Sequence, residues 1–339
     1  MGFKLFVACA FFMAGLGFPS VNGVHAAEKR VVQKGKTRTS AAKPAKASTA
    51  KKRNLAHATR NDSGAVGKAV SPGVLAVQSG SALVVEQTGG DALYQKNAGQ
   101  IVPIASITKL MTAMVVLDGS PALQAAITIT DDDVDYLRGS RSRLHVGSVL
   151  SRESALLLAL MSSENRAANA LARHYPGGMP AFVSAMNIKA QALGMRDTRF
   201  EDPTGLTSNN VSTANDLAKM VVAAHKYPLI REFSTTAEAT VAIGGREMAY
   251  RNTNPLVRSA SWDVGLSKTG YINEAGKCLV MQARVADKPV VIVLLDSVGK
   301  LTRVGDANRI KRWMESTHAS SKSAVHAAVA GAPTDRAPG

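Results

Sequence analysis

Two residues three positions apart, Ser106 and Lys109, have the chemistry to form an activated nucleophile. They open an apolar stretch, residues 107–117, that is typical of a helix, and Pro103 precedes it where proline does no harm. Positions i and i+3 lie on one face of a helix, so hydroxyl and amine would lie side by side at its N-terminus. A serine hydroxyl needs a base. A lysine can serve if burial or a nearby cation lowers its pKa from about 10.4.

Ser-x-x-Lys alone is a common pattern, and an ordinary capped helix explains it equally well. Two later motifs change this interpretation, because Ser163-Glu164-Asn165 and Lys268-Thr269-Gly270 follow in order at domain-scale separations. Ser-x-x-Lys, Ser-x-Asn and Lys-Thr-Gly resemble the motif set of the serine acyl-transferases that recognise penicillin. Three short motifs in this order rarely coincide by chance.

Longer stretches narrow the resemblance. Residues 103–114, Asp202-Pro-Thr-Gly-Leu206 and residues 268–280 resemble the low-molecular-mass D-alanyl-D-alanine peptidases, the S11 family. Residues 162–169 (SSENRAAN) and 250–256 (YRNTNPL) are similar to its penicillin-binding protein 7 branch of endopeptidases. The resemblance implies an antiparallel sheet with flanking helices, as in β-lactamases and D,D-peptidases.

The resemblance also implies roles for the motif residues. Ser106 would be the acylated nucleophile and Lys109 its general base. Ser163 would relay a proton to the leaving amine, Asn165 would bind the substrate amide and hold Lys109, and Lys268 would orient Ser163. Two lysines that converge on one serine repel each other, so we expect the pKa of Lys109 to be lowered.

The rest of the third motif would bind substrate. Thr269 would recognise a carboxylate or carbonyl, and Gly270 would let substrate lie along the strand without a clash. The backbone N–H groups of Ser106 and Tyr271 would form the oxyanion hole. Taken singly, these features have simpler explanations: Asn165 as a helix cap, Lys268 as a solvated strand residue, Asp202-Pro-Thr-Gly as a turn and Glu164 as a surface group.

These features predict an exported serine D,D-peptidase that acts on peptidoglycan stem peptides, with β-lactams as covalent inhibitors. The branch resemblance favours cleavage of D-alanyl–diaminopimelate cross-links; release of terminal D-alanine by a carboxypeptidase is the close alternative. A β-lactamase is a weaker one, since no Glu-x-x-Leu-Asn segment separates Asn165 from Lys268. A non-catalytic wall-binding protein is disfavoured by the intact motif set. We expect no cofactor and no metal site, and we interpret the acidic stretch 131–135 as a solvated turn and helix start.

The chain has 339 residues and a net charge of +16. Residues 1–26 resemble a secretory signal peptide, with a short basic start, an apolar run and small residues before a cleavage site, which predicts a periplasmic protein. Residues 27–70 carry twelve Lys or Arg against two acids and few large apolar groups. We expect this segment to be disordered and to favour an anionic wall or membrane surface; export argues against nucleic acid.

The remaining pattern predicts one catalytic domain, residues 71–316, and a disordered tail, residues 317–339. The expected fold class is α/β (α+β), an antiparallel sheet flanked by helices with an inserted, mainly helical lobe. Strands are expected within residues 73–87, 92–95, 239–243, 246–250, 264–271, 278–284 and 289–296. Besides the helix at Ser106, helices are expected at 152–161, 166–174, 180–193, 213–226 and 301–315. After Tyr227-Pro228 the pattern indicates β-structure.

Overall fold

The computed structural model describes residues 75–330, with side chains described up to residue 320. The predicted signal peptide, the basic segment 27–70 and residues 331–339 lie outside this range. Within the described range no helix combines the length and hydrophobicity that a bilayer span requires.

A five-stranded antiparallel sheet forms the centre, in the order β2-β1-β11-β10-β9. The first strands of the described chain pair with the last, since β1 lies beside β11. The side chains of the three C-terminal strands are mostly buried on both faces, so helices must cover both sides. The strands are β1 Ser81–Glu86, β2 Ala92–Lys96, β9 Asp263–Ile272, β10 Gly276–Val285 and β11 Lys288–Ser297.

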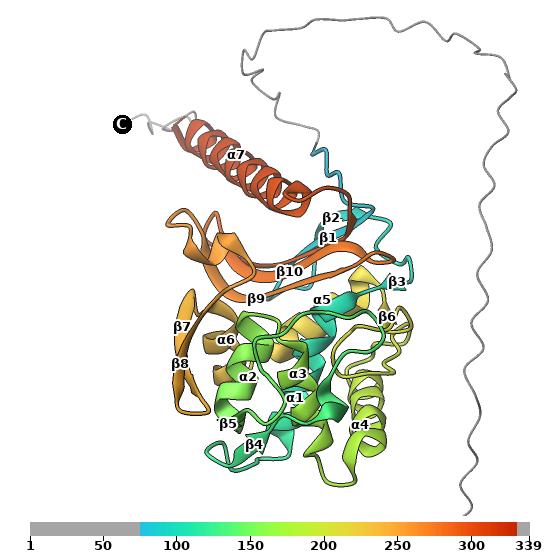
Figure 1. Cartoon of the computed structure of the whole chain (residues 1–339). Helices are drawn as coiled ribbons and strands as arrows, with labels where there is room; N and C mark the ends of the chain where they lie inside the picture. Colours follow the sequence, from blue (N-terminus) through green and yellow to red (C-terminus); the bar gives the residue numbers. More distant parts are fainter. Residues whose placement is uncertain (1–74, 331–339) are drawn as a thin grey trace, which may run out of the picture. The chain divides into compact units, whose positions relative to one another are not determined.

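One face of the sheet is covered by α7, Thr302–Ala330 (Figure 1). Its Ile310 and Met314 join a buried cluster with sheet residues such as Ile292. The helix extends well beyond residue 316, so the prediction of disorder from residue 317 is wrong as far as Ala330. Alanine is the strongest helix former, and the alanine-rich sequence holds no proline before Pro333.

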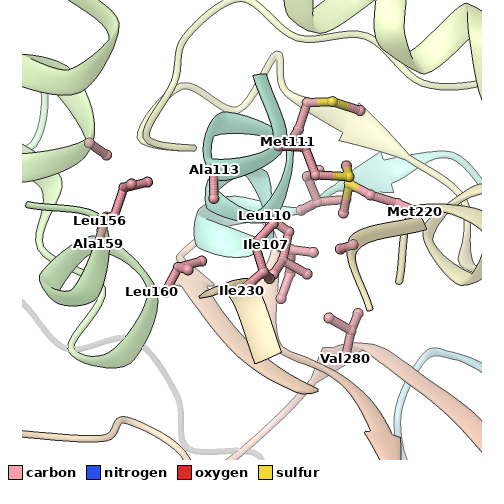
Figure 2. Packing of buried hydrophobic residues seen from close by; sticks show 14 of the residues in the cluster. Ile107, Leu110, Met111, Ala113, Leu156, Ala159, Leu160, Met220, Ile230 and Val280 are labelled. Atoms are coloured by element: carbon pink, nitrogen blue, oxygen red, sulfur yellow. The ribbon is translucent and has the colours of Figure 1, made fainter. Parts of the chain in front are cut away.

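The opposite face carries the helical lobe (Figure 1). Its central helix, α1, is buried from Thr108 to Val116, as expected for a helix that is apolar on all sides. Figure 2 shows Leu110 and Ile107 packed between Leu160 of α2, Met220 of α5 and Ile230 of α6. The six helices of the lobe are α1 Thr108–Asp118, α2 Arg152–Met161, α3 Asn165–Arg173, α4 Gly178–Ala192, α5 Ala214–Ala224 and α6 Pro228–Thr235.

The hairpin predicted around Gly244-Gly245 is confirmed, as β7 Glu238–Ile243 and β8 Arg246–Arg251. The sequence predicts no helix between Pro228 and this hairpin, but Pro228 begins α6, at a position where proline is well tolerated. Short ladders join β3 Val102–Pro103 to β6 Val211–Ser212 and β4 Ala126–Thr128 to β5 Val149–Ser151.

The acidic stretch also departs from expectation. Residues 131–133 form a 3₁₀ turn, but Asp133 is buried and pairs with Arg173 at 2.8 Å. Asp135 is buried as well and accepts backbone hydrogen bonds from Leu137, Arg138 and Ser140. Asp133 therefore holds the loop to α3, and Asp135 orders the backbone of the loop itself, whereas the sequence predicts both carboxylates to be solvated.

Candidate active site

Ser106 lies in a 3₁₀ turn, Ala105–Ile107, directly before α1. Ala105 has a φ of +48°, an uncommon conformation for a residue with a side chain. The turn is held on both sides, because Ile104 N–H donates to Asn210 O at 3.1 Å and Thr108 Oγ1 donates to Ala105 O at 2.8 Å. This strained, well-supported turn leaves the Ser106 side chain half-buried.

Lys109 is fully buried, and its Nζ has three oxygen neighbours. These are Ser106 Oγ at 2.8 Å, Asn165 Oδ1 at 2.7 Å and Thr204 O at 2.7 Å. An amide oxygen and a backbone carbonyl only accept hydrogen bonds. A neutral lysine must therefore direct its two N–H bonds to Asn165 and Thr204, which leaves its lone pair facing the Ser106 hydroxyl. The neutral amine is thus positioned as a base for this serine.

Burial lowers the pKa of Lys109 to about 7, against the opposing effect of Asp202 and Glu164. The cause differs from the predicted repulsion between two lysines. That repulsion acts on Lys268, whose pKa is held well below its usual value by burial, by Lys109 and by Arg303. The neutral form of Lys109 is consequently well populated near neutral pH.

The second motif connects α2 to α3. Ser163 adopts a left-handed backbone conformation with a φ of +63°, and Lys268 Nζ donates to its Oγ at 2.8 Å. Asn165 opens α3 and is anchored on its other side, since its Nδ2 donates to Ser140 Oγ at 2.9 Å. The structure thus brings Ser106, Lys109, Ser163, Asn165 and Lys268 together.

The third motif lies on the edge strand β9. Thr269 Oγ1 donates to Thr253 Oγ1 at 2.7 Å, and the Tyr271 side chain is exposed. A Cβ on Gly270 would lie 2.8 Å from Ile104 O and 3.1 Å from Ser106 N. Glycine is therefore required at this position because β9 lies close to the turn that carries Ser106. The sequence predicts a different reason, namely space for the substrate along the strand.

Asp202 organises a loop that sequence reasoning treats as a simple turn. Its carboxylate accepts hydrogen bonds from the backbone N–H groups of Thr204, Gly205 and Thr207. The loop thereby presents Thr204 O to Lys109. Gly205 has a φ of +79°, and a Cβ there would collide with Ala105 O at 1.9 Å. The only sequence signal for this role is the Asp-Pro-Thr-Gly string itself.

Arg303 of α7 also reaches the site and is not predicted from the sequence. Its Nη1 donates to Gly270 O at 2.9 Å and to Cys278 O at 3.0 Å. The helix on the far face of the sheet thus adds positive charge beside Lys268 and fixes the carbonyl of the last residue of the third motif. A single arginine at the start of a helix carries no motif that could reveal this contact.

The arrangement suits acyl transfer. One serine faces a buried neutral lysine, and a second serine–lysine pair adjoins it, so protons can be accepted at one serine and donated at the other. Between residues 75 and 320 no group of three or more His, Cys, Asp or Glu side chains is placed to hold a metal ion.

Comparisons with known proteins agree with this geometry. Residues 67–299 match the S11 peptidase family, described as D-alanyl-D-alanine carboxypeptidase. A D-alanyl-D-alanine endopeptidase of Pseudomonas aeruginosa is 53% identical over 239 residues, 70% of this chain and 77% of the relative. One of Escherichia coli K12 is 48% identical over 241 residues, 70% of this chain and 78% of the relative.

Solved structures give the same result. The Streptomyces K15 DD-transpeptidase superposes with a TM-score of 0.67 at 30% identity, over 72% of this chain and 98% of that one. A D-alanyl-D-alanine carboxypeptidase of Mycobacterium tuberculosis H37Rv gives a TM-score of 0.64 at 25% identity, over 73% and 94%. The sequence motifs, the serine–lysine geometry and these matches together place the chain in the S11 family of serine D-alanyl-D-alanine peptidases.

Proposed function

We propose that this protein is an exported D,D-endopeptidase that hydrolyses D-alanyl–diaminopimelate cross-links in peptidoglycan through an acyl-enzyme on Ser106. The observation that carries the proposal is the environment of Lys109 Nζ, which lies 2.8 Å from Ser106 Oγ and otherwise faces only acceptors. The choice of cross-links is supported by the relatives from Pseudomonas aeruginosa and Escherichia coli, both named endopeptidases.

In the acylation step, neutral Lys109 removes the hydroxyl proton of Ser106 while Oγ bonds to the D-alanyl carbonyl carbon. The backbone N–H groups of Ser106 and Tyr271 stabilise the negative charge on the carbonyl oxygen. Asn165 binds the substrate amide. The same nucleophile opens a β-lactam ring, which makes penicillins covalent inhibitors.

Ser163 handles the leaving group. Its hydroxyl gives a proton to the departing amine and is oriented by Lys268, whose Nζ lies 2.8 Å from Oγ. Thr269 recognises the carboxylate next to the cleaved bond. Water then attacks the acyl-enzyme and gives a proton to the Ser163–Lys268 pair, which restores the donor used in acylation. Protonated Lys109 returns its proton to Ser106 Oγ as the acyl bond breaks and the product acid leaves.

Purified muropeptides distinguish the two candidate reactions. We expect the mature protein to convert cross-linked tetrapeptide dimers into monomers, as identified by product mass. A D,D-carboxypeptidase, which the family description favours, would instead release D-alanine from pentapeptide monomers and leave dimers intact. That second outcome would replace the endopeptidase assignment while keeping the catalytic residues.

We further propose that the protein is periplasmic and that residues 27–70 bind the cell wall. A periplasmic protein with a segment of twelve basic and two acidic residues would be held at anionic sacculi. We expect deletion of residues 27–70 to weaken sedimentation with sacculi and to leave penicillin acylation nearly unchanged, because the three motifs lie downstream. Binding should also fade as salt rises, since the Debye length is about 10 Å at 0.1 M.

The deletion is judged by a sacculus pull-down at two ionic strengths beside an acylation assay. Salt-insensitive binding that survives the deletion would place the wall contact on the catalytic domain. A collapse of acylation would instead mean that the segment supports the active site.

A further inference from the structure

A pocket with a volume of about 980 Å³ adjoins Ser163 without containing the reacting atoms. Ser162 and Glu164, on either side of that serine, line one wall. Residues 141–143 and the β7–β8 hairpin form the others. The reacting residues do not line it, and this includes Ser163 itself as well as Ser106, Lys109 and Lys268. The pocket is therefore separate from the reacting groups and opens beside the chain segment that carries the proton donor of the leaving amine.

Three arginines and two glutamates line this pocket. Arg251 lies 3.4 Å from Glu238, with both side chains largely exposed. Glu164 accepts a hydrogen bond from Ser142 Oγ at 2.7 Å. Within the described part of the chain, Arg141 and Arg143 have no carboxylate partner within 4.0 Å. The pocket thus holds an excess of positive charge, two of whose carriers are not neutralised by a carboxylate.

Arg143 is fixed in place rather than free in solvent. Its guanidinium stacks over the ring of buried Tyr250, 3.7 Å from the centroid, and Nη1 donates to Ala249 O at 2.7 Å. A guanidinium has five N–H donors in a planar fork, so a single carbonyl leaves most of them for a ligand. A stacked arginine loses little freedom when it binds a planar carboxylate, which suits it to anion recognition.

We propose that this pocket binds carboxylates of the stem peptide that leaves during acylation. The proposal rests on the endopeptidase function above, because it concerns the leaving group of that reaction. Ser163 protonates the leaving amine, so the remainder of the leaving group must occupy space that adjoins Ser163. When a cross-link is cleaved, the leaving group is a whole stem peptide with several carboxylates. Its diaminopimelate amine is part of the amide bond that is cleaved.

The pocket would therefore distinguish cross-links from pentapeptide ends. In a carboxypeptidase reaction the leaving group is one D-alanine, which ends at the carboxylate next to the cleaved bond and does not extend into a neighbouring pocket. Glu164, Tyr250 and Arg251 also lie in the two stretches, residues 162–169 and 250–256, whose sequence resembles the endopeptidase branch. Part of the pocket wall thus comes from the segments by which this chain resembles that branch.

The double variant Arg141→Gln/Arg251→Gln tests the pocket, with Arg246→Gln as the matched control. Arg246 is an exposed arginine of the same hairpin that does not line the pocket. Each protein is assayed with a cross-linked tetrapeptide dimer, a pentapeptide monomer and a soluble penicillin. We expect the double variant to lose about tenfold in kcat/KM on the dimer, mainly through KM, since tenfold corresponds to two weakened charge contacts. Penicillin acylation should be unchanged in all three proteins.

A dimer with amidated carboxylates on the leaving stem tests the charge directly. We expect the wild-type protein to cleave it about tenfold more slowly than the acid form, and the double variant, which keeps Arg143, to discriminate less between the two forms. Equal loss with Arg246→Gln, loss of penicillin acylation in parallel, or unchanged dimer cleavage by the double variant would overturn the pocket proposal alone. Failure of the wild-type protein to cleave any dimer would overturn the endopeptidase function itself.

Discussion

Acylation by a soluble penicillin should fall about 10²- to 10⁴-fold when Lys109 is replaced by arginine. Arginine keeps the positive charge and a long side chain, but a guanidinium stays protonated in proteins and cannot accept the Ser106 proton. The structure makes this substitution decisive, because Lys109 is the amine at 2.8 Å from Ser106 Oγ and its two other neighbours only accept hydrogen bonds. Time courses of adduct formation by intact-protein mass give the rate.

The pH dependence of the wild-type protein is the companion measurement. Burial lowers the pKa of Lys109 to about 7, and only the neutral amine is a base. The acylation rate should therefore rise about tenfold per pH unit below pH 7 and level off above it. The arginine variant should lack this rise, and its circular dichroism spectrum shows whether it is folded. Near wild-type acylation by a folded Lys109→Arg protein would show that another group is the base.

The catalytic motifs were accessible from the sequence because each is a short contiguous string with its own chemistry. Ser106 and Lys109 are related by helical spacing, and their order with Ser163 and Lys268 identifies a known set of reacting groups. The supporting contacts were not accessible for a physical reason. Thr204 and Gly270 act through their backbone carbonyls, which accept hydrogen bonds from Lys109 and Arg303. Every residue has such a carbonyl, so no particular residue type in the sequence marks these contacts.

Some elements of the fold could also be predicted from the sequence, and others could not. The last two strands, β10 and β11, were predictable, since apolar runs of strand length end at turn residues. The start of α6 was missed because Pro228 is equally suited to a turn and to the first position of a helix. The ion pair between buried Asp133 and half-buried Arg173 joins residues far apart in the chain, and a run of aspartates by itself indicates only a solvated loop.

The requirement for Gly270 illustrates how structure changes an explanation without changing the residue. A glycine in a strand indicates that something approaches the backbone closely. The sequence suggests substrate, whereas the structure places Ile104 O and Ser106 N there. The glycine thus sets the spacing between β9 and the turn that carries the nucleophile.

The central claim, that Ser106 is the acylated residue, is tested most directly by intact-protein mass after treatment with penicillin. The wild-type protein should gain the mass of one penicillin molecule, in an adduct that persists because no water-activating segment of the β-lactamase type was found in the sequence. The variant Ser106→Ala removes the attacking oxygen and keeps the buried Lys109, and it should show no adduct at any time. An adduct that forms at the wild-type rate in Ser106→Ala would contradict the account.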